Sequence, residues 1–180
     1  MAAVRARPGH FNYSSSGTGG AAHLAVALFA SLAKLDMVHI PYKGAAPSMT
    51  DLVAGQVNST FAQPVSVIGF AKAGKIKVLG VSSKSRLAAW PDAPPVMDTV
   101  PGYESASWQG LVAPARTPPV ILDRLHRTVV GALNTPDLRK RLTEEGSEIG
   151  GMPPAEFATY IRAEIAKWAR VVREANIKVD

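Results

Sequence analysis

The sequence contains no cysteine, and this absence excludes several classes of site. Disulfide bonds, thiolate metal centres and cysteine nucleophiles all require a thiol. The four histidines show no spacing typical of metal ligands, so we expect no metal site. The serines lack the Gly-x-Ser-x-Gly context of a hydrolase nucleophile, and we expect no catalytic residues. A chain of 180 residues can nevertheless bury a core without disulfides or metals.

Long hydrophobic runs are also missing. A helix that spans a bilayer needs about 20 apolar residues, and the longest candidate here, residues 25–33, is much shorter. The segment MAAVRARPGH at the start lacks the apolar core of a signal peptide, so nothing in it is expected to direct export.

Acidic residues are fewer than basic ones, 14 against 20, which gives a formal net charge of +6. This balance favours anionic partners in general. The basic residues are scattered, however, and their densest cluster, LRKRL at 138–142, is typical of the polar face of a short helix. We therefore expect small anions, and no nucleic acid, as partners.

Strand-like segments alternate with helical patterns in the first half of the chain. Such alternation predicts an α/β fold with a mostly parallel sheet and helices on its faces. The expected strands are residues 11–15, 37–42, 57–62 and 76–83, and the expected helices are residues 21–35, 47–54 and 64–74.

The second half has a different character. Residues 86–103 are rich in proline and are predicted to form an extended connection, followed by a strand at 105–114. Helices are expected after Thr117 and after Thr135, where proline follows a capping residue. The apolar face expected for the last helix consists of Phe157, Ile161, Ile165, Trp168, Val172 and Ala175. These helices need a partner, so we expect them to pack across the first half or to be completed by a part that the sequence lacks.

The segment SSSGTGG stands between the first expected strand and the first expected helix. In open parallel sheets this is where ligands bind. The first N–H groups of a helix have no intrahelical partner, and the helix dipole favours an anion there. The segment is therefore a candidate site for a carboxylate or a phosphate, unless its small residues only cap the helix and form a tight turn. The candidate residues are Ser15, Ser16, Gly17, Thr18, Gly19 and Gly20.

Three further residues belong to the same hypothesis. Lys43 and Gly44 follow the second expected strand and could form a second edge of the site, although Lys43 could equally be solvated. His23, on the first turn of the helix, could donate to a ligand or bond to neighbouring main chain.

The spacing Gly17-x-Gly19-x-x-Ala22 also fits a loose dinucleotide-binding pattern. That pattern requires an acidic residue at the end of the next strand, where this sequence has Tyr42 and Lys43. From the residues alone, the sequence predicts an α/β protein that binds a small anion.

Several segments together resemble one family, the periplasmic solute-binding receptors of tripartite tricarboxylate transporters, also called Bug or TctC proteins. The segments are YSSSGTGGAAHLAVALF, HIPYKGAAPSMTDLVAGQV, KAGKIKVLGVSSKSR, WPDAPPVMDTVPGYESASWQGLVAPARTPP and PPAEFATYIRAEIAKWARVVREANIK. They occur in the order found in the family and cover nearly the whole chain.

The resemblance implies a type II periplasmic-binding-protein-like fold in which two lobes close over a small organic carboxylate. It implies a receptor without enzymatic activity or cofactor that delivers its ligand to membrane permease subunits in the periplasm. Main-chain N–H groups of one strand-to-helix loop on each lobe would hold the carboxylate. Residues 9–104 would form a near-complete second lobe, and residues 105–180 the crossing strand and C-terminal helices of an incomplete first lobe.

Two alternatives follow from the same observations. The chain could be a nucleotide-dependent enzyme that uses the Gly17-x-Gly19-x-x-Ala22 loop. It could also be a fragment without a ligand, in which exposed helix faces drive self-association. Family members begin with a signal peptide and most of the first lobe, so we expect this chain to correspond to the C-terminal part of a receptor, with weakened binding of the acid.

Overall fold

The computed structural model describes residues 1–178, which form two compact units. The first unit comprises residues 1–107 together with the chain from Trp168 onward, and the second comprises residues 108–167. The long helix α7 (Pro154–Glu174) is shared between the two units. In the described part of the chain, no helix is both long and apolar enough to cross a membrane.

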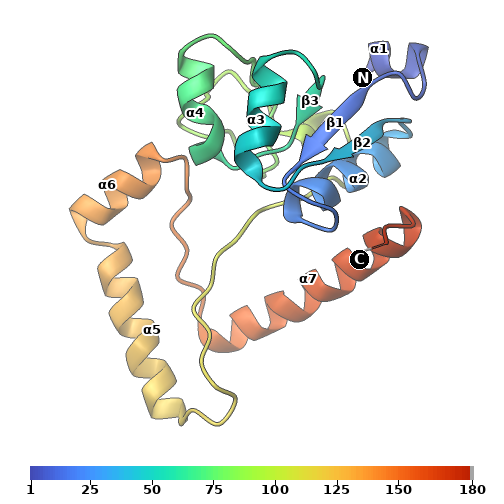
Figure 1. Cartoon of the computed structure of the whole chain (residues 1–180). Helices are drawn as coiled ribbons and strands as arrows, with labels where there is room; N and C mark the ends of the chain where they lie inside the picture. Colours follow the sequence, from blue (N-terminus) through green and yellow to red (C-terminus); the bar gives the residue numbers. More distant parts are fainter. Residues whose placement is uncertain (179–180) are drawn as a thin grey trace. The chain divides into compact units, whose positions relative to one another are not determined.

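The first unit is built on a three-stranded parallel sheet (Figure 1). Strand β1 (Asn12–Ser15) lies in the centre, between β2 (Val38–Pro41) and β3 (Ser59–Thr60). Tyr13 of β1 is in register with His39 of β2 and Ser59 of β3. The first three expected strands are thus confirmed with shorter bounds, and their carboxyl ends meet at one edge of the sheet.

A helix follows each of these three strands, as the sequence predicts. They are α2 (Ala21–Ala33), α3 (Ala45–Val53) and α4 (Pro64–Lys72), and a short helix α1 (Ala2–Ala6), which the sequence analysis did not anticipate, precedes β1. The end predicted for α3 at residue 54 is confirmed to within one residue, and Gly55 just beyond it takes the positive φ of +75° that favours glycine.

The core of the first unit contains side chains from distant parts of the sequence. Tyr103 is 1% exposed and makes an edge contact with Phe29 of α2, with ring centroids 6.1 Å apart. The proline-rich segment, which includes the short 3-10 helix η1 (Val96–Asp98), is therefore more than a connection, since it supplies core residues. The buried cluster consists of Ala27, Leu28, Ala33, Val100, Tyr103 and Val171.

The expected fourth strand at residues 76–83 is wrong. Its contact with another segment is an isolated bridge, in which Val81 donates its N–H to the Pro94 carbonyl and accepts the N–H of Val96. Prolines carry no N–H, so a ladder cannot continue through Pro94 and Pro95. Leu79, two residues before the bridge, is 75% exposed.

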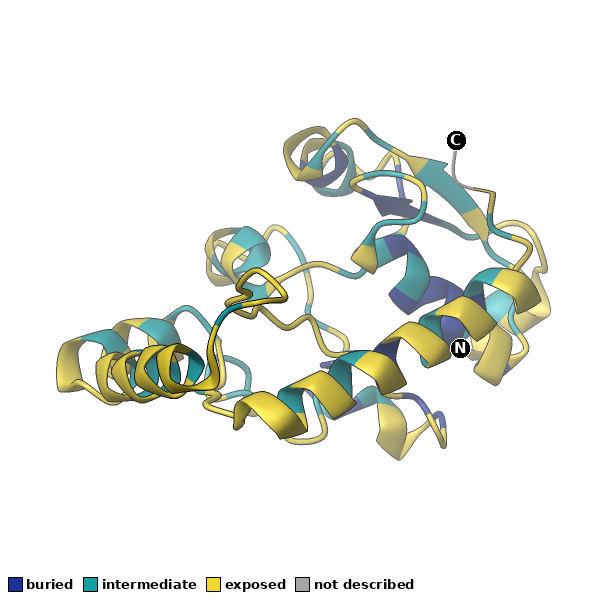
Figure 2. Ribbon diagram, turned by 90° about the horizontal axis from the view of Figure 1, so that it is seen from below, coloured by how far each residue is buried: buried dark blue, intermediate teal, exposed yellow. Residues whose placement is uncertain are grey.

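The second unit contains α5 (Pro119–Leu133), α6 (Pro136–Glu144) and the first part of α7. The predicted start at Thr135 is confirmed, and α5 begins two residues after Thr117. The expected strand at 105–114 is wrong, because no described segment pairs with it. Leu111 and Val112 are 67% and 79% exposed. Figure 2 shows buried residues gathered around the sheet and α2, whereas α5 and α6 are intermediate or exposed.

The predicted apolar face of α7 needs a correction. Val171 is 2% exposed and Glu164 is 7% exposed, whereas Ile165 is 63% exposed and Ala175 is also exposed. The prediction holds for Phe157, Ile161, Trp168 and Val172, which are half-buried, but the most buried positions lie on the adjacent row. A carboxylate occupies one of these positions and forms an ion pair with Lys167, which the apolar pattern could not reveal.

Candidate functional site

Two strand-to-helix loops lie next to each other at the carboxyl edge of the sheet. The Tyr42 N–H donates to the Ser15 carbonyl at 3.0 Å, and the Gly44 N–H donates to the Ser16 carbonyl at 3.1 Å. The β1–α2 loop (residues 15–20, here the anion loop) and the β2–α3 loop (residues 42–44) are therefore joined by main-chain hydrogen bonds. All the predicted site residues lie in these loops or, for His23, on the first turn of α2.

The anion loop leads directly into α2. Gly20 is the N-cap of this helix, and the first intrahelical bond runs from the Leu24 N–H to the Gly20 carbonyl at 3.0 Å. The N–H groups of Ala21, Ala22 and His23 precede it and have no acceptor within the helix. The helix dipole adds partial positive charge at the same point. Donors for an anion are thus present without any charged side chain on the loop.

The three glycine amides of the anion loop are satisfied inside the protein, that of Gly20 by the Gly17 carbonyl at 3.3 Å. The Gly19 N–H donates to His23 Nδ1 at 3.0 Å, and the Gly17 N–H donates to Ser15 Oγ at 3.3 Å. Gly19 has a φ of +75°, a conformation that is strained for other residues. The loop is therefore held in a defined shape by its neighbours.

The predicted hydroxyl donors have different surroundings. Ser15 is 1% exposed, and its Oγ lies 3.0 Å from the Gly17 carbonyl and 2.7 Å from His39 Nε2. It supports the loop from within. Ser16 and Thr18 are exposed, so their hydroxyls can reach a ligand in solution.

His39 is a feature of this site that the sequence analysis missed. Its ring stacks on that of His23 with centroids 3.7 Å apart, and the ring of Tyr13 also stacks on His39, with centroids 5.0 Å apart. Burial lowers the pKa of His39 to about 4, with the nearby His23 as a second cause, and burial also lowers the pKa of His23. The parallel pairing of β1 and β2 is the signal that could have placed His39 beside Tyr13.

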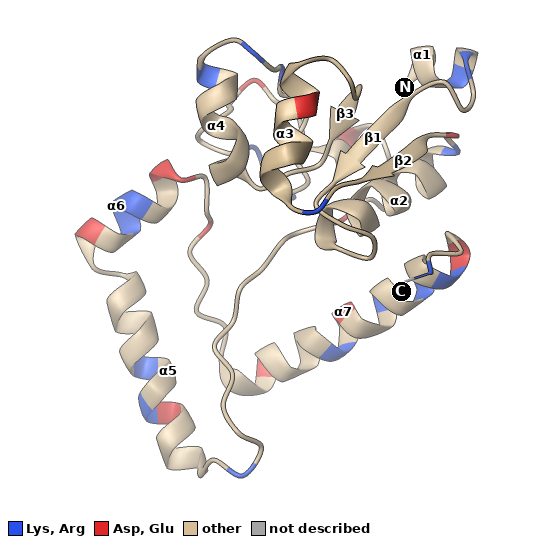
Figure 3. Cartoon of the chain, viewed as in Figure 1, with Lys and Arg blue, Asp and Glu red and all other residues tan. Residues whose placement is uncertain are grey.

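The β2–α3 loop contributes an exposed cation. Lys43 is exposed, and Gly44 forms the N-cap of α3 with a φ of +118°. The neighbouring Tyr42 hydroxyl donates to Asp51 of α3 at 2.7 Å, and this bond is the main reason why the pKa of Tyr42 is raised. The three strands themselves carry no Lys, Arg, Asp or Glu, and Figure 3 shows the charges on loops and helices. An anion at this edge would therefore meet no acidic residue from the strands.

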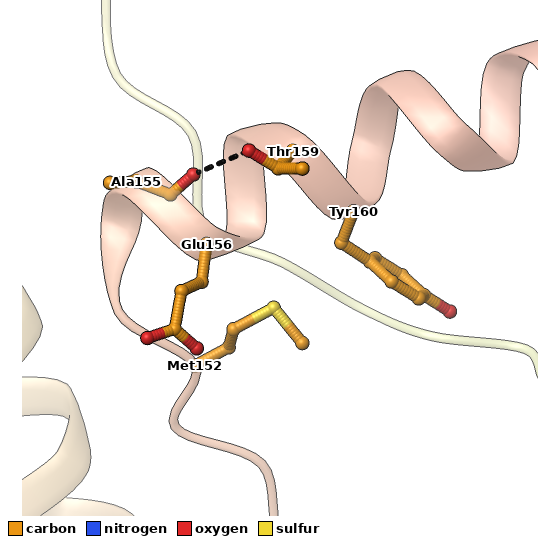
Figure 4. A pocket seen from close by; sticks show the side chains of 5 residues that line it. All are labelled: Met152, Ala155, Glu156, Thr159 and Tyr160. Atoms are coloured by element: carbon orange, nitrogen blue, oxygen red, sulfur yellow. Dashed lines mark hydrogen bonds between the residues drawn. The ribbon is translucent and has the colours of Figure 1, made fainter.

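A separate pocket of about 480 Å³ lies in the second unit. Its walls come from the first turns of α7 and from Met152, two residues before the helix, as Figure 4 shows. The Thr159 hydroxyl bonds to the Ala155 carbonyl of its own helix at 3.2 Å. The pocket is thus a broad hollow along one helix, lined by Met152, Ala155, Glu156, Thr159 and Tyr160.

The fold and the two loops define a class of protein, an α/β module with helix-start amides at the carboxyl edge of a parallel sheet. In the described residues, no group of three or more His, Cys, Asp or Glu could hold a metal ion. The chain belongs to the tripartite tricarboxylate transporter family receptor family, whose sequence pattern matches residues 1–177.

Comparison with known proteins gives related sequences and structures. A protein of the tcbD-tcbE intergenic region of Pseudomonas sp. (strain P51) is 31% identical over all of this chain and 54% of its own length. An R. palustris protein, Rpa4515, solved with adipate, is 34% identical with a TM-score of 0.85, over 98% of this chain and 59% of that one. MatC from Rhodopseudomonas palustris, solved with malate, is 30% identical with a TM-score of 0.79, over 95% of this chain and 60% of that one. The chain thus spans about half the length of most curated relatives that it matches.

These likenesses confirm the predicted type II periplasmic-binding-protein-like α/β fold. The family consists of solute-binding proteins and not of enzymes, so the nucleotide-dependent enzyme is ruled out as an alternative. The exit of β2 agrees with this conclusion, since Tyr42 and Lys43 stand where a dinucleotide site needs an acid.

Proposed function

We propose that this chain supplies one carboxylate-binding lobe of a solute receptor that serves a tripartite tricarboxylate transporter. The observation that carries the proposal is the start of α2, where three main-chain N–H groups without intrahelical acceptors adjoin a second strand-to-helix loop. The solved relatives with adipate and malate support a dicarboxylate as the class of ligand.

The binding mechanism follows from the geometry of the loop. A carboxylate oxygen accepts N–H bonds from the first turn of α2, and the hydroxyls of Ser16 and Thr18 and the Lys43 ammonium add further contacts. In a complete receptor, the other lobe closes over the ligand, which shifts the population from open to closed. The complete receptor then works in the periplasm and passes the acid to membrane permease subunits.

The division into lobes is part of this proposal. Residues 9–104 would belong to one lobe, and residues 105–180, an extended segment followed by the C-terminal helices, to the other. The boundary between the compact units falls between residues 107 and 108, and the chain from Trp168 onward belongs to the first unit. With one carboxylate-binding loop of two, we expect this chain alone to bind the acid much more weakly than a complete receptor.

A titration monitored by amide chemical shifts tests the proposal. Adipate added to the 15N-labelled chain should shift the amides of residues 16–23 and 43–46, and the uncharged analogue adipamide should not. If adipate leaves these amides unchanged and shifts others, the proposed site is wrong.

A proline substitution at the start of α2 makes the test specific to one donor. Ala21 is the first residue of the helix and is exposed, and the extended backbone of Gly20 allows proline to follow. Ala21→Pro therefore removes one N–H while keeping the helix, and it should weaken adipate binding about tenfold, the loss of one charge-assisted bond. Ala21→Ser keeps the N–H and is the matched control. Equal affinity of the two variants would contradict a role for this amide.

A further inference from the structure

The anion loop is held from behind by two stacked imidazoles that come from different elements. His23 lies on the first turn of α2 and is 7% exposed, and His39 lies on β2. Their rings are 3.7 Å apart and inclined by 15°. Each bonds to one part of the loop, His23 to the Gly19 amide and His39 to the Ser15 hydroxyl.

The hydrogen bonds fix which nitrogen of His23 carries a proton. The Gly19 N–H is a donor, so His23 Nδ1 must be its acceptor and must be unprotonated. Protonation of His23 would place a second hydrogen in this bond, where two donors would face each other. The contact between the helix and the loop therefore exists only while His23 is neutral.

The hydrogen bonds of the Ser15 hydroxyl give His39 a different role. The Ser15 hydroxyl has one hydrogen, which it donates to the Gly17 carbonyl at 3.0 Å. Its oxygen accepts the Gly17 N–H at 3.3 Å, and His39 Nε2, 2.7 Å away, is then a donor to it as well. His39 thus positions Gly17 through Ser15.

We propose that His23 and His39 form a proton-sensitive latch that holds the anion loop in its binding shape only while the His23 imidazole is neutral. Acid breaks the latch at His23, because the bond to Gly19 is lost and two stacked cations repel each other. The effect on carboxylate capture rests on the proposed function, whereas the latch itself does not. Both histidines act as positioning residues.

The surroundings of the two rings favour this behaviour. Tyr13 and the Ser15 hydroxyl of β1 face the two imidazoles, and the Gly19 amide faces them from the anion loop. On α3, Ser48 bonds to Ser14 of β1 at 2.8 Å, and the carboxylate of Asp51 accepts the Tyr42 hydroxyl. Burial and, for His39, the neighbouring His23 are the causes of the lowered pKa values, and no carboxylate is among them. The charged residues flanking β2 in sequence, Asp36 and Lys43, are exposed.

An NMR titration of the full chain between neutral and acid pH tests the latch without any ligand. Imidazole 15N shifts should show His23 with its proton on Nε2 at neutral pH. As His23 titrates below the usual histidine pKa, the Gly19 amide should shift with the same midpoint and lose its protection from hydrogen exchange. His23→Asn places an amide oxygen where Nδ1 lies, so Gly19 should stay protected and its shift should become independent of pH. His23→Gln cannot place an acceptor there, and Gly19 should be unprotected at every pH.

The alternatives give distinct results. If Gly19 shifts with acid in His23→Asn as in the unsubstituted chain, or if His23 carries its proton on Nδ1 at neutral pH, the latch is wrong. His23→Asn also removes the stacked charge that helps to lower the pKa of His39, so the His39 midpoint should rise in this variant; an unchanged His39 midpoint would contradict coupling of the rings. Absence of adipate binding with intact pH behaviour would overturn the proposed function and leave the latch standing.

Discussion

The two units of the chain differ in how completely they bury their own apolar side chains. The first unit surrounds its sheet with helices and buries an aromatic cluster, so Tyr103 is 1% exposed. In the second unit, Leu111, Val112 and Val120 are each at least 67% exposed. The difference shows that a lobe with a parallel sheet can form its core locally, whereas helices without a sheet leave their apolar faces open.

The comparison is tested most strongly by truncating one buried and one exposed side chain. Tyr103→Ala should lower the free energy of unfolding by about 3–5 kcal/mol, because it removes a large ring from a packed cluster. Ile165→Ala, at a position 63% exposed, should change it by less than about 0.5 kcal/mol. Urea denaturation followed by circular dichroism measures both. Similar losses would mean that Ile165 is covered in solution.

A pair of glycines separates backbone strain from packing. An added Cβ would meet no atom within 4 Å at Gly44 or at Gly69, so space is open at both positions. Gly44 has a φ of +118°, whereas Gly69 lies inside α4. Gly44→Ala should therefore cost about 1–3 kcal/mol, and Gly69→Ala should stabilise by about 0.4–1 kcal/mol. Thermal unfolding of the two variants distinguishes them, and a loss at Gly69 would contradict the helix there.

The stability of the first unit should depend on pH through its buried histidines. A folded-state pKa below the unfolded value of 6.5 means that the unfolded chain binds more protons between the two values. Stability is therefore full above pH 6.5 and is lost as the pH falls toward about 4, by about 1–2 kcal/mol after allowance for partial exposure. His39→Gln should flatten this slope in urea midpoints measured across the range. An unchanged slope would assign the loss to other groups.

Local signals in the sequence predicted much of the first unit. Strands β1 and β2 and the helices that follow them, α2 and α3, are predicted by patterns within a few residues. The strands at 76–83 and 105–114 were wrong because a strand also needs a partner. For Val81 the partner segment contains Pro94 and Pro95, which have no N–H to extend the ladder. For residues 105–114 the described chain supplies no partner.

The site was predictable to the same extent. The anion loop and its neighbour follow from strand-to-helix geometry, because parallel strands bring their carboxyl ends together. The stacking of His39 on His23 depends on the register of two strands, which single residues do not reveal. A pattern of small residues thus indicates where an anion could bind, but not what holds the loop in shape.

The smallest effect on stability is expected at the exposed apolar residues of the second unit. Val112 is 79% exposed, so Val112→Lys should change the free energy of unfolding by less than about 0.5 kcal/mol. Its effect should appear in association, because an exposed apolar patch favours contact between copies and an added charge opposes it. Light scattering over a range of concentrations should show larger species for the unsubstituted chain than for Val112→Lys. The matched control Lys140→Ala, on the polar surface of α6, should leave association unchanged. If the unsubstituted chain stays monomeric at every concentration, the prediction of self-association is wrong, and the exposed apolar residues of the second unit do not bind a second copy of the chain.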